Sequence, residues 1–233
     1  MSSRLRLLCA GAAQGLTQAL APILERDARC EVRARFMPVG ALEEALIAGD
    51  ACDVVVSSVA MLERFAREAR VAGATIARLG AVHTGVAVRA GDRVPAIDTE
   101  ERLRAALSAA PRLYVPDPHR ATAGIHFVKV LRALGLYDRL AARLVAHPNG
   151  VAAMTALAAA QERGALGCTQ ITEILCTAGV ALVGALPGPF ALATPYAAAV
   201  SATAAEPELA RRFIAMLTAP ANADPRHAAG FEA

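Results

Sequence analysis

The stretch Tyr114-Val115-Pro116-Asp117-Pro118-His119-Arg120-Ala121-Thr122-Ala123-Gly124-Ile125-His126 contains both the end of an apolar run and the start of a helical pattern. Residues 113–115 are typical of a strand end, two prolines stop the strand, and a helix is predicted over residues 124–134. The free N–H groups of a first helical turn and the helix dipole make such a junction a cradle for anions. Thr122 can act as the N-cap or offer its hydroxyl to a ligand. The alternative is an ordinary strand-to-helix connection in an α/β domain.

Three earlier junctions have the same form. Strands predicted at residues 5–9, 31–36 and 53–56 are each followed by small or hydroxyl-bearing residues. Helices are then predicted at residues 16–27, 41–48 and 61–69. In an open parallel sheet these connections meet at the carboxyl edge, where ligands bind. The sequence therefore predicts a ligand site built from several loops.

The rest of the chain continues the alternation of strands and helices, which indicates an α/β fold. Residues 80–90 form a long extended run, and Pro187-Gly188-Pro189 marks a non-helical crossing. We expect the tail after Pro220 to lie loosely on the surface. Further helices are predicted at residues 99–108, 137–144, 151–162 and 206–217, and a short one that follows residues 170–173 and ends at residue 178. Further strands are predicted at 145–147, 164–169 and 196–201. Two sets of strand-loop-helix units thus predict two lobes joined by two extended crossings.

Composition argues against several classes of function. The 233 residues carry a net charge of +3, and the basic residues are scattered among few aromatic ones, so no nucleic-acid surface is expected. Prolines and glycines interrupt the most apolar stretch, residues 180–200, which argues against membrane insertion. The five cysteines form no Cys-x-x-Cys pair, so we expect buried thiols, no metal site and no cofactor.

The beginning of the chain bears on its compartment. Residues 4–9 already have the pattern of a first strand, and no basic segment with an apolar core precedes them. The sequence as written therefore predicts a cytoplasmic protein, or a periplasmic one if a signal peptide has been removed.

Short motifs in a fixed order resemble the type 2 periplasmic-binding-protein fold, in its molybdate-binding-protein-like branch. The motifs are Leu7-Leu8-Cys9-Ala10-Gly11-Ala12, Gly40-Ala41-Leu42, Asp53-Val54-Val55-Val56-Ser57-Ser58, Asp117-Pro118, Ala123-Gly124, Leu134-Gly135-Leu136 and Gly167-Cys168-Thr169-Gln170. The resemblance implies two lobes, residues 1–80 with 190–233 and residues 81–189, each a mostly parallel sheet flanked by helices. It also implies two crossing strands, a ligand in the cleft between the lobes and hinge closure.

The resemblance to molybdate binders is weakest at the site itself. Ala12-Ala13-Gln14 stands where a serine is expected, Val39-Gly40-Ala41 replaces a serine-rich turn, and Gln170 replaces a frequent tyrosine. The run Gln170-Ile171-Thr172-Glu173, together with His126, is more similar to the aconitate-isomerase-like subset. That similarity implies an organic di- or tricarboxylate ligand, which helix N-termini also suit.

The candidate residues fall into two groups. His126 and Glu173 are the acid/base candidates if the protein is an enzyme, since His titrates near neutrality and burial raises the pKa of a carboxyl group. Their alternatives are a half-exposed helix residue and a charge at a helix N-terminus. The candidate ligand-binding residues are Gly11, Ala12, Ala13, Gln14, Gly40, Ala41, Ser57, Ser58, His83, Arg120, Thr122, Ala123, Gly124, His126, Asn149, Gly150, Gln170 and Thr172.

Three functions are consistent with these residues. The first is a solute-binding protein for a small organic carboxylate, partnered by an ABC transporter if it is exported. The second is a cofactor-independent isomerase of the aconitate type that moves an allylic proton, and the third is a molybdate or other tetrahedral oxyanion binder. No nucleophile, base and orienting group can be assembled from spacing alone.

Overall fold

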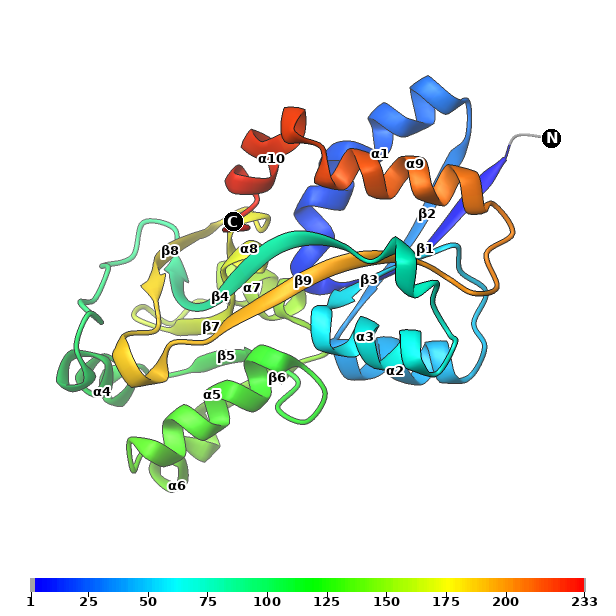
Figure 1. The fold of residues 1–233 in the computed structure, drawn as a ribbon. Helices are drawn as coiled ribbons and strands as arrows, with labels where there is room; N and C mark the ends of the chain where they lie inside the picture. Colours follow the sequence, from blue (N-terminus) through cyan, green and yellow to red (C-terminus); the bar gives the residue numbers. More distant parts are fainter. Residues whose placement is uncertain (1–2, 233) are drawn as a thin grey trace. The chain divides into compact units, whose positions relative to one another are not determined.

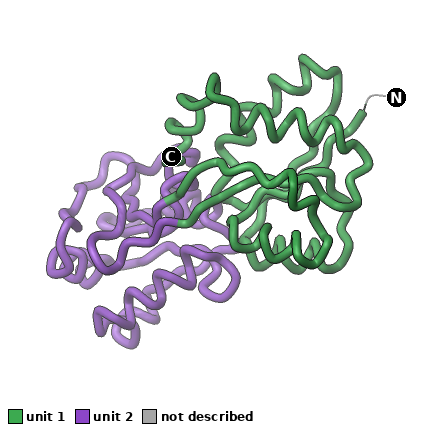
Figure 2. Tube along the Cα trace, in the orientation of Figure 1, with its two compact units in different colours: residues 1–82, 194–233 green, residues 83–193 purple. Residues whose placement is uncertain are grey.

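The computed structural model describes residues 3–232, which fall into two compact units, 3–82 with 194–232 and 83–193 (Figure 2). Two long strands, β4 (Ala77–Arg89) and β9 (Ala193–Val200), carry the chain from one unit into the other (Figure 1). The prediction of an α/β fold with two extended crossings is therefore confirmed.

The first unit is built on a sheet with the strand order β2-β1-β3-β9. The strands β1 (Arg4–Ala10), β2 (Glu31–Met37) and β3 (Val54–Ser58) are parallel, and β9 joins β3 in antiparallel register. The helices α1 (Gln14–Ala28) and α9 (Pro207–Thr218) lie side by side on one face. The other face carries α2 (Val39–Ile47) and α3 (Val59–Arg67) (Figure 1). Because helices cover both faces, the β3 valines 54–56 are fully buried, as is typical of a central parallel strand.

One buried carboxylate ties the first unit together. Asp53, just before β3, is fully buried and accepts the Arg6 amide N–H at 2.7 Å and the Arg6 Nε–H at 3.2 Å. It also accepts the amide N–H groups of Ala205 at 2.7 Å and Glu206 at 3.2 Å, at the start of α9. Burial by itself would raise the pKa of Asp53, but these hydrogen bonds outweigh burial and lower the pKa.

The second unit contains β5 (Leu113–Pro116), β6 (Leu144–His147), β7 (Leu166–Gln170) and β8 (Val180–Ala185). Parallel β5 lies between β6 and β7, while β4 pairs antiparallel with β7 and β8. The helices are α4 (Glu100–Ala109), α5 (Thr122–Ala133), α6 (Tyr137–Leu140), α7 (Gly150–Ala158) and α8 (Ile171–Leu175).

Successive residues of the strands in this unit pack against different helices, α5 and α7. Val86 and Val115 share an apolar cluster with Phe127 of α5, whereas Ala87 and Tyr114 share one with Met154 of α7. Since successive side chains of a strand point to opposite faces, α5 and α7 cover opposite faces of the sheet. The strand ends are thus held between two layers of helix.

Several boundaries differ from the prediction. The helix expected over residues 137–144 ends at Leu140 and continues as a 3-10 turn, and α7 ends four residues before residue 162. The 187–189 crossing follows a strand, β8, and contains a 3-10 turn, Gly188–Phe190. Proline explains that turn, because its fixed φ suits the first turn of a helix.

The expectation of a loose tail was wrong. After Pro220 the chain forms a 3-10 turn, Pro220–Asn222, and the short helix α10, Ala223–Ala228. Phe231 is buried, and Glu232 exchanges two backbone hydrogen bonds with Ala81 of β4. The sequence signal was weak because α10 is six residues long and contains a proline.

Candidate functional site

Three helices of the first unit begin directly after its parallel strands. β1 is followed by the 3-10 turn Gly11–Ala13 and then α1, which begins at Gln14. β2 is followed by Pro38 and then α2, and β3 leads straight into α3. No side chain caps the first turn of α1, α2 or α3. Because β1, β2 and β3 are parallel neighbours, the three uncapped N-termini share one edge of the sheet, where backbone N–H groups can receive an anion.

The predicted residues of this unit lie at that edge. Gly11, Ala12 and Ala13 are buried in the 3-10 turn, and Gln14 is half-buried. The structure corrects one boundary, since α2 begins at Val39. Gly40 therefore lies in its first turn together with Ala41, rather than in a turn that precedes the helix. Proline explains the difference, because Pro38 is extended and serves as N-cap, so the helix can start immediately after it.

The two serines at the end of β3 have different surroundings. Ser57 is buried and its hydroxyl lies 2.9 Å from Met61 Sδ, one turn into α3. Ser58 is half-buried at the N-cap of α3, and its hydroxyl makes no capping hydrogen bond. Ser58 is therefore the serine whose hydroxyl is better placed to serve a ligand.

In the second unit, α5 starts close to the end of β5. Asp117 Oδ1 accepts the amide N–H groups of His119 at 2.8 Å and Arg120 at 3.1 Å, which folds the connecting loop back. Gly124 is required because a Cβ there would clash with the backbone oxygens of Pro116 and Asp117. This contact presses the first turn of α5 against the strand end.

Thr122 is not the N-cap of α5. The cap position belongs to Ala121, which has extended backbone and no capping side chain, and Thr122 is the first helical residue. The sequence suggested Thr122 because threonine is a common cap. Asp117, however, turns the chain early enough for the helix to begin at Thr122 itself. The half-buried Thr122 and the buried Ala123 and Gly124 thus form an uncapped first turn.

The N-terminus of α7 is satisfied by the protein itself. Asn149 is its N-cap, with Oδ1 accepting the amide N–H of Ala152 at 2.8 Å. The amide N–H of Gly150 is bound by the carboxylate of Glu173. A Cβ at position 150 would overlap that carboxylate, so only glycine fits beside Glu173.

Glu173 is a buried carboxylate with three donors. It accepts the hydroxyl of Thr169 and the amide N–H groups of Gln170 and Gly150. Since Gln170 is the N-cap of α8 and Glu173 is its third residue, the bond from the Gln170 amide to Glu173 is one half of a capping box, and the Gln170 side chain does not supply the other half. Burial raises the pKa of Glu173, although the three hydrogen bonds act against that rise.

Gln170 and two threonines form a group of buried polar side chains without partners. Thr84 of β4 lies opposite Gln170 in the antiparallel ladder, and Thr172 follows two residues later. The exposed fractions of Thr84, Gln170 and Thr172 are 0%, 3% and 2%. Among the described residues, the hydroxyls of both threonines and both polar atoms of the Gln170 amide have no hydrogen-bond partner. An unpaired buried polar group costs about 1–3 kcal/mol, so the group is suited to receive a ligand.

The remaining candidates lie elsewhere in the second unit. His126, the fifth residue of α5, is half-buried, and its Nε2 lies 2.8 Å from the backbone oxygen of Phe190. That bond fixes the ring, with Nε2 as donor, and leaves Nδ1 for other chemistry. His83 is half-buried on β4, and Arg120 is exposed in the loop before α5.

Sequence reasoning missed two residues of this unit, Thr84 and His147. His147 ends β6 and stacks on Tyr114 at 6.0 Å between ring centroids. Among the described residues its Nε2 is buried without a hydrogen-bond partner, and burial lowers the pKa of the ring. Period-two alternation could have found Thr84, because it shares the buried face of β4 with Val82 and Val86.

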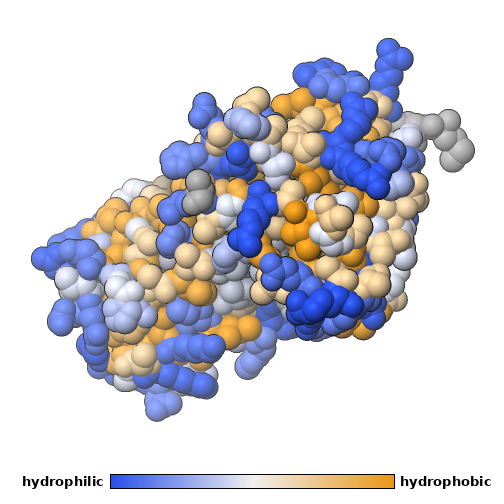
Figure 3. Space-filling model, in the orientation of Figure 1, coloured by the Kyte–Doolittle hydropathy of each residue, from blue (hydrophilic) through white to orange (hydrophobic). Residues whose placement is uncertain are grey.

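Two classes of site are not observed over residues 3–232. No three His, Cys, Asp or Glu side chains are grouped as metal ligands would be. No helix in the same range combines the length and apolar character of a membrane-spanning segment. Hydrophilic residues are spread between apolar patches over the face drawn in Figure 3.

Comparison by sequence gives one family. Residues 5–232 match the family model described as bacterial extracellular solute-binding protein. No protein with a curated description matches the chain.

Comparison by structure gives many similar folds at low sequence identity. The periplasmic molybdate-binding protein of Azotobacter vinelandii is 19% identical with a TM-score of 0.80, over 98% of this chain and 99% of that one. A tungstate ABC transporter structure from Geobacter sulfurreducens is 17% identical with a TM-score of 0.66, over 95% and 96% of the two chains. PEB3 with bound L-phospholactate is 15% identical with a TM-score of 0.69, over 98% and 99%. These likenesses show the type 2 periplasmic-binding-protein fold that the sequence predicted.

Proposed function

Because the chain belongs to the family of bacterial extracellular solute-binding proteins, we propose that it binds a small anion and delivers it to an ABC transporter. The observation that carries the proposal is the set of uncapped helices α1, α2 and α3 at one edge of the first unit's sheet. Their N–H groups and dipoles favour an anion without any charged side chain. An exported chain would meet its transporter at the membrane surface.

A tetrahedral oxyanion is the ligand class that the relatives favour. Molybdate and tungstate are the solutes named for two of the similar structures. An oxyanion of that shape has several equivalent acceptor oxygens, and so it can be held by backbone N–H groups from several helices at once. The hydroxyl of Ser58, at the N-cap of α3, would supplement these donors.

An organic carboxylate is the second candidate, and one observation favours it. The side-chain amide of Gln170, which has no hydrogen-bond partner among the described residues, provides both a donor and an acceptor. A carboxylic acid with a hydroxyl or a second carboxyl group would use both. PEB3, whose structure holds L-phospholactate, has a comparable fold.

Calorimetric titration separates the two classes. The purified protein is titrated with molybdate, tungstate and sulfate, and in parallel with citrate, cis-aconitate and trans-aconitate. We expect micromolar binding of at least one tetrahedral oxyanion, and a ligand at about 100 times its Kd should add about 2.7 kcal/mol to the free energy of unfolding. Tight binding of a carboxylate alone would select the second candidate, and absence of binding by every anion would overturn the proposal.

The same samples test for turnover. Aconitate isomerisation changes the ultraviolet spectrum, so the titrated solutions can be followed over hours with His126→Ala and Glu173→Ala as comparisons. A solute-binding protein leaves the spectrum unchanged. Turnover that both substitutions abolish would instead establish the isomerase.

A further inference from the structure

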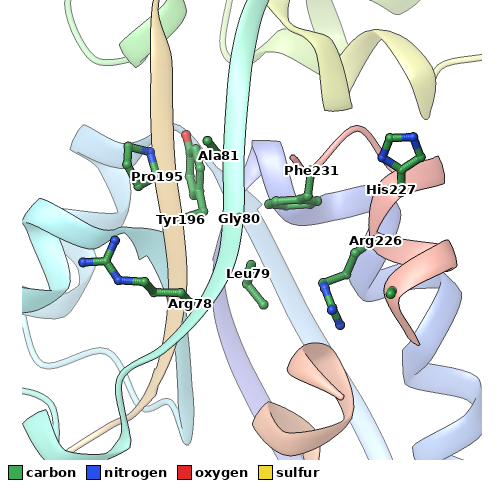
Figure 4. Close-up of a pocket in the computed structure, with 10 residues that line it drawn as sticks. Arg78, Leu79, Gly80, Ala81, Pro195, Tyr196, Arg226, His227 and Phe231 are labelled. Carbon is green, nitrogen blue, oxygen red and sulfur yellow. The ribbon is translucent and has the colours of Figure 1, made fainter. Parts of the chain in front are cut away.

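We propose that a pocket beside α10, within the first unit, is a second ligand site that takes an organic anion with an aromatic-sized apolar body. The pocket has a volume of about 520 Å³, which lies inside the usual range for small-molecule sites. It is formed by the first half of β4, the start of β9 and the C-terminal segment (Figure 4). Its lining residues are Arg78, Leu79, Gly80, Ala81, Pro195, Tyr196, Ala223, Arg226, His227 and Phe231.

The wall of this pocket is fixed at both ends. Arg226 Nη1 donates to the backbone oxygens of Leu217 at 3.0 Å and Ala219 at 2.8 Å, which anchors α10 to the end of α9. Glu232 donates to the Ala81 oxygen at 2.8 Å and accepts from the Ala81 amide N–H at 2.7 Å. The C-terminal segment is thus held within α10 and again after it, and a preformed pocket saves the ordering cost of binding.

The body of the pocket is apolar and aromatic. Leu79, Tyr196 and Phe231 are at most 5% exposed, and the two rings meet edge to face at 6.4 Å between centroids. In Figure 4 the Phe231 ring lies on the same side of β4 as Leu79. A flat ligand ring can add to this pair in the offset or edge-to-face geometry that aromatic groups prefer.

The charged side chains of the lining are two arginines, Arg78 and Arg226. Arg78, Arg226 and His227 line the pocket, and among the described residues no aspartate or glutamate does. Arg226 is half-buried and, among the described residues, forms no ion pair, while its Nη2 and Nε remain for a further acceptor. Figure 4 shows its guanidinium on the side of Leu79 and Phe231, with Arg78 extending to the other side of β4. We therefore assign the anionic head of the ligand to Arg226, whose planar donors suit a carboxylate.

A matched pair of probes tests the site. The protein is titrated with 2-naphthoate and with its neutral isostere 2-naphthamide at neutral pH, using saturation-transfer NMR and calorimetry. We expect naphthoate to bind at least about tenfold more tightly, because only the anion pairs with Arg226. Equal affinity for the two probes, or no binding of naphthoate at millimolar concentration, would overturn the assignment.

Substitutions in the lining test whether naphthoate binds in this pocket. Ala223→Trp fills the pocket from an exposed position and should weaken naphthoate binding at least about tenfold, while Ala221→Trp, on the neighbouring 3-10 turn, should not. Arg226→Lys keeps the charge but loses the planar fork, so it should weaken the binding of naphthoate more than that of naphthamide. Unaltered naphthoate binding in Ala223→Trp would refute the site even if Arg226→Lys fails to fold.

The result is independent of the proposed function. If both sites exist, molybdate and naphthoate bind together, and Ala223→Trp removes only the second. If the protein binds no inorganic anion, naphthoate binding is still expected. Displacement of naphthoate by molybdate would place both ligands in one site and overturn the inference.

Discussion

Thr84 on β4 and Gln170 at the end of β7 face each other across the antiparallel ladder, and both carry buried polar atoms that lack partners among the described residues. Such atoms lower stability unless a ligand completes them. We expect Thr84→Val and Gln170→Leu to keep or raise the free energy of unfolding of the unliganded protein, by up to about 1 kcal/mol. The same variants should bind the anion about tenfold more weakly.

The measurement combines urea unfolding with calorimetric titration of molybdate. Thr155→Val is the matched control, because the Thr155 hydroxyl donates to the Val151 oxygen on the exposed side of α7. Destabilised variants with unchanged affinity would show that the Thr84–Gln170 pair serves the fold alone.

The first turn of α5 allows its amide and hydroxyl donors to be tested separately. Thr122→Val removes only the hydroxyl, whereas Thr122→Pro also removes the amide N–H from the first helical residue, where proline is tolerated. The extended backbone of Ala121 is compatible with a following proline. If the backbone binds the anion, Thr122→Pro should weaken affinity by about 1.5–3 kcal/mol, and Thr122→Val by less.

The control for that pair is Glu100→Pro, at the first residue of α4. This helix is capped by Thr99, whose hydroxyl accepts the Arg102 amide N–H, and it follows no strand end of the proposed site. Calorimetric affinity should be unchanged. Equal affinity in Thr122→Pro and the wild type would exclude the α5 N-terminus from the binding site.

Glu173 is expected to make stability depend on pH. Its raised pKa means that the folded state holds the proton more tightly than the unfolded state, whose value is near 4.5. The stabilising contribution is therefore complete below about pH 4.5 and is lost as pH rises through the folded-state pKa. As pH rises through the folded-state pKa of Glu173, the free energy of unfolding of the wild type should therefore fall relative to that of Glu173→Gln. Urea unfolding of both proteins at several pH values measures this difference.

Removal of the Glu173 side chain has a different consequence. Glu173→Ala leaves the Thr169 hydroxyl and the Gly150 and Gln170 amides without their acceptor, which should cost about 2–4 kcal/mol. Glu208→Gln, in the exposed first turn of α9, is the control for loss of a charge. A Glu173→Ala variant as stable as the wild type would mean that these donors find other acceptors.

Asp53 should have the opposite dependence on pH. Its pKa is lowered, so its contribution is complete above the unfolded value near 3.8 and is lost as pH falls through the folded value. Asp53→Asn presents a donor to the N–H groups of Arg6 or Ala205, and we expect a loss of about 3–5 kcal/mol at neutral pH. In the Asp53→Asn variant, the free energy of unfolding should no longer fall with acid pH as it does in the wild type. The measurement is urea unfolding of both proteins at several acid pH values, and an equal fall in both would contradict the prediction.

Most of the architecture could be predicted because its signals are local. The run Val54-Val55-Val56 between Asp53 and Ser57 is typical of a buried parallel strand, and small residues after it mark a helix start. The junctions at Gly11, Gly40, Ser57 and Gly124 were found for the same reason. These features depend on neighbours in sequence, so their period and composition reveal them.

The site was less predictable because its decisive contacts are distant in sequence. Nothing in the residues around Gly150 indicates that its amide N–H donates a hydrogen bond to the Glu173 carboxylate. Likewise, nothing around His126 indicates that its ring hydrogen-bonds to the backbone oxygen of Phe190. Thr84 was passed over for its neighbour His83, since chemistry draws attention to histidine before burial is known. Only strand register puts Thr84 opposite Gln170.

The docked tail depends on another distant contact, between Gly80 and Glu232. Gly80 has a φ of 131°, and a Cβ there would clash with the Glu232 backbone oxygen. Gly80→Ala should therefore strain β4, release the Ala81–Glu232 hydrogen bonds and destabilise the first unit by about 1–3 kcal/mol. Hydrogen exchange should then show faster exchange at the Ala81 and Glu232 amides, with no change at Thr84 in the second unit.

Gly91→Ala is the matched control for that substitution. Gly91 also has positive φ, at 86°, but a Cβ there meets nothing within 4 Å, so only the conformational cost of about 1 kcal/mol remains. Protection of the Ala81 and Glu232 amides should be retained in this variant. If Gly80→Ala keeps the same protection, the Ala81–Glu232 hydrogen bonds survive the substitution, and the predicted release of the tail by the clash at Glu232 is wrong.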